Sequence, residues 1–239
     1  MNIYVYEDQD ALNLEPLSLT RPVFDIRIGS ETFLDRIQFL YPNATISVFV
    51  RESIADFTKQ KYPNLEVNPK EINDGLWLLG NVIWGKNTLS KLNNDSCAFY
   101  YKNQCIGANL NSDQGKEWLD AGGPTQSLPQ IKNKIEVDVT LCQFLWEIIH
   151  CIPNTIEYEM GTFNNTYGEK DGDRLSLVNP DHILINKATI QPNVTINATY
   201  GPVLIDSGVE IYGPSYLEGP IYIGSDTIIK PLTQIKNSV

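Results

Sequence analysis

The chain has 239 residues, a formal net charge of −11 at pH 7 and only two histidines. This length fits one large domain or two modest ones, with enough chain to bury a core. The acidic balance excludes a nucleic-acid binder that relies on a broad basic surface, although a few arginines can still hold a small anionic ligand. No apolar run reaches the roughly 20 residues that span a bilayer, and the N-terminus lacks a signal-peptide pattern, so we expect a cytoplasmic protein with no membrane partner.

The first half of the chain alternates short apolar runs with stretches of helical spacing. Ser30 is the expected N-cap of the first helix, and a proline follows each of the two helical stretches. The apolar run at 76–84 is typical of a central strand that is covered on both faces. This alternation predicts a parallel, Rossmann-like α/β sheet. The predicted elements are, in order, a strand at 2–6, a helix at 30–40, a strand at 44–50, a helix at 52–62 and a strand at 76–84.

Two further elements are predicted in the middle of the chain. Residues 97–110 read as a β-hairpin with a Lys-Asn turn, and residues 139–149 carry a helical apolar stripe that is followed by Pro153. The four cysteines form no CxxC pair and stand among apolar or strand-like neighbours. We therefore interpret them as buried structural thiols.

The second half follows a spacing of six residues. Isoleucine or leucine recurs at this spacing from Ile205 to Ile235, with smaller side chains in a second row four residues later. Upstream, Leu184, Ile190 and Ile196 follow the same rule, and the frame slips at 200–202. A left-handed parallel β-helix produces this period, because each hexad forms one flat face and three faces complete a coil.

The polar stretch GEKDGDR at 168–174 separates the two patterns. We therefore predict an α/β domain at 1–138, a helical connector and linker at 139–178, and an incomplete left-handed β-helix at 179–239.

The segment at 14–37, LEPLSLTRPVFDIRIGSETFLDRI, resembles the opening of sugar-phosphate nucleotidyltransferases. Its TRPVFDIRIG stretch looks like a divergent bacterial and archaeal branch, and the hexads resemble those of hexapeptide-repeat acyltransferases. This order of parts is similar to that of the bifunctional N-acetylglucosamine-1-phosphate uridylyltransferase/glucosamine-1-phosphate N-acetyltransferase family. The resemblance implies nucleotidyl transfer from a nucleoside triphosphate to a sugar 1-phosphate, with Mg²⁺ as the expected cofactor.

The chain departs from this family where the family has a glycine-rich phosphate loop. The corresponding stretch at 7–13, EDQDALN, has no glycine and three acids. Asn13 stands at the loop's arginine position, and Val23 stands at the position of the lysine that follows the family's TRP motif. Only glycine lets a backbone approach phosphate closely. The acids are either metal-facing or simply solvated, and the sequence assigns no metal ligand.

Positive charge for a phosphate must then come from Arg21 and Arg27, our candidate catalytic residues. A guanidinium is planar and always charged, so it binds phosphate in bidentate fashion. Both arginines flank Asp25, and the alternative is a structural clamp in which they pair with it. Thr20, Asp25 and Gly29 of the same segment are candidate substrate-binding residues.

Gly80 and Asn81, after the predicted central strand, are two further candidate substrate-binding residues. The family has a Gly-Asp pair here whose carboxylate holds Mg²⁺, whereas the Asn81 amide is a weaker, neutral ligand. Asn81 either contacts the sugar or nucleotide or is a turn residue, and Asp74 is a weaker alternative.

The resemblance implies formation of UDP-N-acetylglucosamine from UTP and N-acetylglucosamine 1-phosphate, within a longer protein that forms a homotrimer through its β-helix. His150 and His182 do not stand where the resemblance puts the acetyltransferase base, and the chain ends in mid-hexad. We therefore expect a shortened chain that does not acetylate. The alternatives are a degenerate module that binds sugar nucleotide without turnover, or a portion that only drives assembly of an acyltransferase.

Overall fold

The computed structural model describes residues 1–85, 88, 96–161, 163 and 175–238. The chain divides into two compact units, of which the first comprises Met1–Arg27 and Glu31–Glu147 and the second comprises Ile28–Ser30 and Ile148–Val239. The division falls within helix α5 (Leu145–Met160), which begins later and runs further than the predicted helix at 139–149. Pro153 lies inside this helix instead of ending it.

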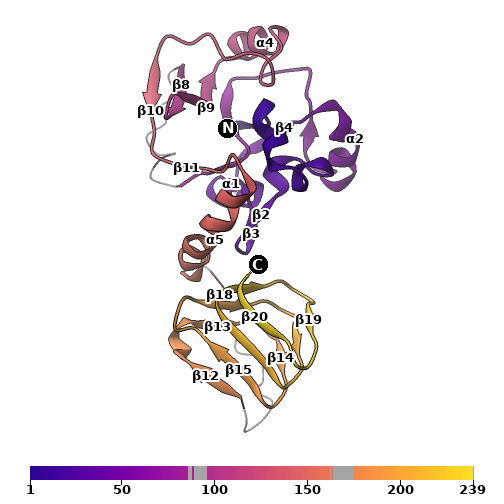
Figure 1. Ribbon diagram of the computed structural model, residues 1–239. Coiled ribbons are helices and arrows are strands. Elements are labelled where there is room, and N and C mark those ends of the chain that lie inside the picture. The colour runs from indigo at the N-terminus through magenta and orange to yellow at the C-terminus, as the bar shows by residue number, and fades with distance from the viewer. Residues whose placement is uncertain (86–87, 89–95, 162, 164–174, 239) are drawn as a thin grey trace. The chain divides into compact units, whose positions relative to one another are not determined.

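The first unit contains a mixed seven-stranded sheet with the order β10-β8-β9-β6-β1-β4-β5 (Figure 1). β1 pairs in parallel with β4 and β6, and β4 pairs in parallel with β5, so this part has the predicted Rossmann-like arrangement. β9 runs antiparallel to β6 and β8, and the sheet is therefore not wholly parallel. The strands are β1 (Asn2–Tyr6), β4 (Thr45–Phe49), β5 (Glu66–Val67), β6 (Gly75–Leu79), β8 (Cys97–Tyr101), β9 (Gln104–Leu110) and β10 (Lys134–Glu136).

The predicted strands at 2–6 and 44–50 and the hairpin at 97–110 are confirmed by β1, β4 and the β8–β9 pair. The apolar run at 76–84 is instead broken by a turn at Gly80 and Asn81. Its second part, β7 (Val82–Ile83), pairs with β11 (Thr140–Leu141) in a separate two-stranded sheet. Trp77 of β6 is fully buried and stacks on Tyr4 and Phe49, with ring centroids 4.5 and 5.0 Å apart.

Helices α1 (Phe33–Leu40), α2 (Glu52–Lys61) and α4 (Ser112–Asp120) accompany this sheet. α2 confirms the prediction, whereas α4 was not predicted. The N-cap of α1 is Thr32 and not Ser30, because the Thr32 hydroxyl accepts from the Asp35 N–H and the Asp35 carboxylate accepts from the Thr32 N–H. The remaining short elements are β2 (Arg27–Ile28), β3 (Glu31–Thr32) and the 3₁₀ turns η1 (Gln9–Leu14), η2 (Leu17–Leu19) and η3 (Val23–Asp25).

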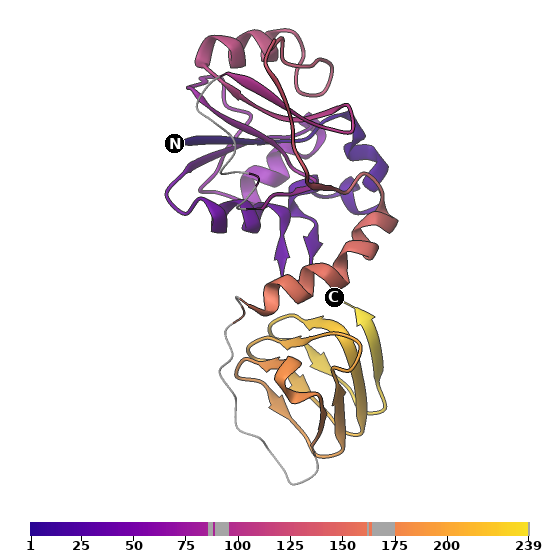
Figure 2. The same ribbon diagram turned by 90° about the vertical axis from the view of Figure 1, so that its left-hand side faces the viewer.

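The second unit contains most of α5 and, from Ser176 on, strands that pair in parallel with one another (Figure 2). One sheet has the order β12-β15-β18-β16-β13 with β20 added to β18, and a second has the order β14-β17-β19. These elements are β12 (Ser176–Val178), η4 (Pro180–His182), β13 (Ile183–Ile185), β14 (Thr189–Ile190), β15 (Val194–Asn197), β16 (Val203–Ile205), β17 (Glu210–Ile211), β18 (Ser215–Ile223), β19 (Ile228–Ile229) and β20 (Gln234–Ser238).

The strand register follows the six-residue spacing after the predicted slip at 200–202, whereas pairs that span this slip depart from it, since Ile196 and its partner Leu217 are 21 residues apart. Ile211 pairs with Ile229 and Leu217 with Ile235, in each case 18 residues apart, which is three hexads. The aliphatic residues of these hexads are buried or half-buried together in one core. The frame predicted through Leu184 is wrong by one residue, because Ile185 pairs with Ile205 in this core while Leu184 packs against a separate cluster around Ile156.

Among the described residues, no helix is long and apolar enough to cross a membrane. Three of the four cysteines are buried, as predicted, while Cys151 is only half-buried.

Candidate functional site

The carboxyl ends of β1 and β6 mark the switch point of the first unit's sheet. The chain leaves β1 toward β4 and β5 on one side and returns to β6 on the other. Open α/β sheets bind ligands at such a point, outside the carboxyl ends of the strands. Glu7, Asp8 and Asp10 follow β1, and Gly80 and Asn81 follow β6. The two stretches that the sequence singled out therefore share this edge of the sheet.

Glu7 fastens the loop between η2 and η3 to this edge. Its buried carboxylate accepts hydrogen bonds from the Val23 N–H (2.8 Å) and from Arg51 Nη1 (3.1 Å). Arg51 also donates to the carbonyl oxygens of Ser18 and Arg21. Burial raises the pKa of Glu7, and the Arg51 charge and the backbone N–H groups act against this rise. The network sets the backbone position of Arg21.

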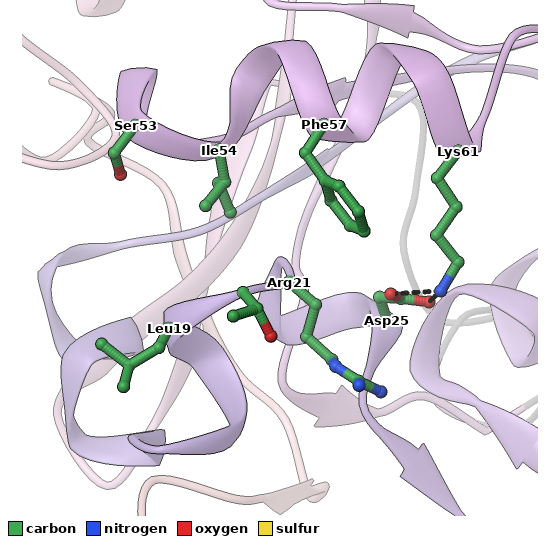
Figure 3. Close-up of a pocket in the computed structure, with 8 residues that line it drawn as sticks. Leu19, Arg21, Asp25, Ser53, Ile54, Phe57 and Lys61 are labelled. Atoms are coloured by element: carbon green, nitrogen blue, oxygen red, sulfur yellow. Dashed lines mark hydrogen bonds and ion pairs between the residues drawn. The ribbon is translucent and has the colours of Figure 1, made fainter.

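A pocket of about 520 Å³ lies between this loop and helix α2 (Figure 3). This volume lies within the usual range of small-molecule sites, roughly 300–1,000 Å³. The pocket brings together three predicted site residues, Thr20, Arg21 and Asp25, with residues of α2 that were not predicted. Its lining consists of Leu19, Thr20, Arg21, Asp25, Ser53, Ile54, Phe57 and Lys61.

Asp25 is buried at one end of this pocket and is held by the end of α2. Lys61 Nζ lies 2.7 and 2.6 Å from its two carboxylate oxygens, and the Tyr62 hydroxyl donates to Oδ1. Burial first, and then the hydrogen bond to Asp25, raise the pKa of Tyr62 strongly. The carboxylate of Asp25 is thus held by Lys61 and Tyr62, neither of which belongs to the clamp of Arg21 and Arg27 that the sequence suggested.

A polar network surrounds the acids that follow β1. Gln104 Nε2 lies 3.5 Å from Asp8 Oδ2 and 3.3 Å from Asp10 Oδ2, and Gln143 Nε2 donates to Gln104 Oε1 at 2.8 Å. Burial, followed by the Asp10 carboxylate, raises the pKa of Asp8 to about 6. Asp8 is therefore a partly desolvated acid beside a second carboxylate, not simply a solvated one.

This pair of carboxylates fits a magnesium ion. Mg²⁺ is usually bound by one or two carboxylates together with water and substrate phosphates, and not by a complete cage of protein ligands. Across the described ranges, no three His, Cys, Asp or Glu side chains are grouped so that they could hold a metal ion by themselves. Asp8 and Asp10 offer carboxylate oxygens at the switch point, and a cation there would relieve their mutual repulsion.

Gly80 and Asn81 are occupied by contacts within the first unit. The Gly80 N–H donates to the Tyr6 carbonyl at 2.8 Å, and a side chain at Gly80 would meet Phe24 and Val23 within about 3.2 Å. Asn81 is buried, and its Nδ2 donates to the Cys142 carbonyl at 2.9 Å. Its Oδ1 is buried and has no hydrogen-bond partner among the described residues.

Gly29 lies in the second unit and so is not grouped with Arg21 and Asp25. It has a φ of +69°, and a Cβ there would lie 2.5 Å from Glu159 Oε2, which accepts the neighbouring Ser30 N–H at 2.7 Å. Arg27 is exposed and is not among the residues that line the pocket.

Sequence reasoning missed Lys61, Gln104 and Gln143. Lys61 stands in the last turn of a helix, where a lysine is commonly explained by the helix dipole. The two glutamines belong to no motif. Their roles arise only because β9 pairs with β6 and the segment before α5 is hydrogen-bonded to the turn after β6.

Comparison with known proteins assigns the family. Residues 3–166 match the model of the sugar nucleotidyl transferase family, which covers more than half of the chain and the whole of the described pocket. A search of curated proteins found no match. The chain therefore belongs to the sugar nucleotidyl transferase family, whose members transfer nucleotidyl groups to sugar phosphates.

Proposed function

We propose that this chain joins UTP and N-acetylglucosamine 1-phosphate into UDP-N-acetylglucosamine and releases pyrophosphate. The family supports the reaction type, and the resemblance of residues 14–37 supports this substrate pair. The observation that carries the proposal is the pocket that both Arg21 and Lys61 line, next to the loop that Glu7 holds at the switch point of the sheet. The presence of two cations in one pocket of an acidic chain favours a ligand that carries phosphate.

In this reaction an oxygen of the sugar 1-phosphate attacks the α-phosphorus of the triphosphate, and the bond to the pyrophosphate leaving group breaks. Such a transfer needs mainly in-line positioning and positive charge. Arg21 would bind phosphate oxygens through its guanidinium, and the Glu7–Arg51 network would keep its backbone in place. The hydroxyls of Thr20 and Ser53 lie in the same pocket and would orient the substrate.

Magnesium is part of the proposal. Asp8 and Asp10 would hold it, and when bound it would neutralise charge on the triphosphate. Gln104, which now lies within 3.5 Å of both carboxylates, would orient them. With the cation present, the acidic stretch after β1 would attract the phosphates instead of repelling them.

The strand register of the second unit supports a β-helix, and the assembly of chains rests on the family resemblance alone. The 18-residue register is what a left-handed β-helix of hexapeptide repeats requires. We propose this fold for the unit, and assembly of three chains through it.

The deciding assay incubates the purified chain with Mg²⁺, UTP and N-acetylglucosamine 1-phosphate and measures pyrophosphate release. A panel of other nucleoside triphosphates and sugar 1-phosphates tests the substrate assignment. We expect Arg21→Ala to lower kcat/KM by about tenfold or more, since it removes a charged hydrogen-bond donor to phosphate. Arg27→Ala removes the same charge from an exposed position outside the pocket lining and should have the smaller effect. The absence of pyrophosphate with every substrate pair would overturn the proposal.

A second candidate function is binding of sugar nucleotide without turnover. It is favoured by the stretch after β1, which forms the 3₁₀ turn η1 and contains no glycine. Binding of UDP-N-acetylglucosamine in calorimetry, together with no turnover of any pair, would support this alternative.

A further inference from the structure

We infer that a nucleoside triphosphate binds in this pocket in one orientation, with its phosphates at the Lys61–Arg21 end and its base against Phe57. Lys61 would then contact the phosphates directly, and Asp25 would act as its positioning residue. The inference rests on the proposed function for the class of ligand, and it adds the orientation of that ligand and two residues that recognise it.

The charged end of the pocket is built from Arg21, Asp25 and Lys61. Asp25 is almost entirely buried, with 2% of its side chain exposed, whereas 43% of the Lys61 side chain is exposed. The ammonium group has three N–H donors, and its two short contacts are to the two oxygens of Asp25. A third donor can therefore be directed toward a ligand. Because Asp25 balances one positive charge, Lys61 and Arg21 together leave this end with one net positive charge.

Asp25 also fixes where Lys61 lies. The Tyr62 hydroxyl donates to Asp25 Oδ1, so the carboxylate is held by two consecutive residues at the end of α2. A lysine side chain loses considerable rotamer entropy when it is ordered by a ligand. The ion pair with Asp25 orders it before the ligand binds, and this lowers the cost of binding.

Away from Lys61 and Asp25 the pocket is lined by Phe57, Ile54 and Leu19, together with the hydroxyl-bearing residues Thr20 and Ser53. Phe57 and Leu19 are large hydrophobic side chains that remain 47% and 57% exposed, and Ile54 lies between Ser53 and Phe57 on α2. In Figure 3 the Phe57 ring projects from α2 toward the loop that carries Arg21. An exposed aromatic ring gives a nucleobase a surface on which to stack. The opposite orientation would place phosphates on apolar side chains and a base on the Lys61–Asp25 pair.

The affinity of the chain for two probes, measured at equilibrium without sugar phosphate, tests this orientation. Pyrophosphate reports on the charged end alone, and UTP reports on both ends, with CTP, ATP, GTP and dTTP tested in turn. We expect Lys61→Gln to weaken the binding of both UTP and pyrophosphate by about tenfold, as for loss of one charged hydrogen bond. Phe57→Ala should weaken the binding of the triphosphate about tenfold and the binding of pyrophosphate less than about twofold. Lys59→Gln is the matched control, because it removes the same charge from the same helix at a surface ion pair with Asp56.

The double variant Asp25→Asn/Lys61→Gln distinguishes direct contact of Lys61 with phosphate from a role in which Lys61 only neutralises Asp25. It removes both charges together, so no buried carboxylate is left without its partner. If Lys61 contacts phosphate, the double variant still binds both probes about as weakly as Lys61→Gln. Recovery of wild-type affinity in the double variant would overturn the inference, because Lys61 would then serve only to neutralise Asp25.

Two other outcomes would also overturn it. One is equal loss of UTP and pyrophosphate affinity in Phe57→Ala, and the other is unchanged affinity for both probes in Lys61→Gln. These binding results are independent of turnover. A chain that binds the probes as expected but releases no pyrophosphate would refute the proposed catalysis, and the inferred orientation of the ligand would stand.

Discussion

Glu7 and Arg51 form an ion pair of 3.1 Å across the carboxyl ends of β1 and β4. The Glu7 side chain is fully buried and the Arg51 side chain is 17% exposed. Through this pair, two neighbouring parallel strands hold the loop that carries Arg21, because Glu7 accepts from the Val23 N–H and Arg51 donates to the Ser18 carbonyl. The pocket wall thus depends on an ion pair that does not line the pocket.

Glu7→Ala should therefore lower both stability and activity. It removes the carboxylate that satisfies Arg51 and the Val23 N–H, and we expect the free energy of unfolding to fall by about 3 kcal/mol. Urea unfolding measures this loss, and kcat/KM measured where the variant is still folded reports the displacement of Arg21. Glu52→Gln, at the exposed neighbouring position, is the control. Unchanged kcat/KM in Glu7→Ala would show that the loop does not need this anchor.

Asp8 should make stability depend on pH. Its pKa is raised from 3.8 to about 6, so the folded chain holds the proton more tightly than the unfolded chain. The stability that this proton contributes is full below about pH 4 and is lost as pH rises through 6. Asp8→Asn should therefore raise the free energy of unfolding at pH 7.5, by at most about 3 kcal/mol, and change it little at pH 4.

Urea unfolding between pH 4 and 7.5, in buffer with EDTA, measures this difference. Asp138→Asn, at an exposed position, controls for loss of one negative charge. A stability gain in Asp8→Asn that is the same at pH 4 and pH 7.5 would contradict the assignment.

Gly29→Ala tests whether Gly29 is a structural residue. The backbone there has a φ of +69°, and the added Cβ would collide with the buried Glu159 carboxylate at 2.5 Å. We expect the free energy of unfolding to fall by about 1–3 kcal/mol. Gly224→Ala is the control, since its Cβ would meet only Tyr222 ring atoms at 3.7 and 3.9 Å. Normal stability with weakened substrate binding would instead support the role in substrate binding that the sequence suggested.

Ile211→Ala tests the core of the second unit. Ile211 is fully buried and pairs with Ile190 on one side and Ile229 on the other. Truncation should cost about 2–5 kcal/mol, because it loses buried apolar surface and leaves a cavity. Ile228→Ala is the comparison, as Ile228 is 52% exposed and its loss should change stability by less than about 0.5 kcal/mol. Thermal unfolding of the two variants measures the difference, and equal shifts would contradict the assigned register.

The elements that were predicted well are those with a strong local signal. The strand at 2–6 and the helix at 52–62 were found because their apolar spacing alone defines them. The start of α1 was wrong because two candidate caps, Ser30 and Thr32, stand close together, and only Thr32 has Asp35 three residues later to complete the box. The break at Gly80 was hidden because residues on both sides of it are apolar.

The residues of the candidate site also differ in whether a local sequence signal identified them. Arg21 and Asp25 were identified from one short segment, and both line the pocket. Lys61 was missed because its contact with Asp25 joins residues 36 apart, and Gln104 was missed because it approaches Asp8 across 96 residues. A contact of this kind depends on which strands become neighbours, and no local pattern records that.

The sequence by itself determined the six-residue period of the second half, the order of β1, α1, β4, α2 and β6, and the TRP segment that points to sugar nucleotide chemistry. These features depend on spacing along the chain. Only the tertiary structure decided that Lys61 joins Arg21 in one pocket, that Asp8 is desolvated beside Gln104, and that Gly29 packs on Glu159. The reason is physical, since burial and charge pairing are set by neighbours in space and not by spacing along the chain.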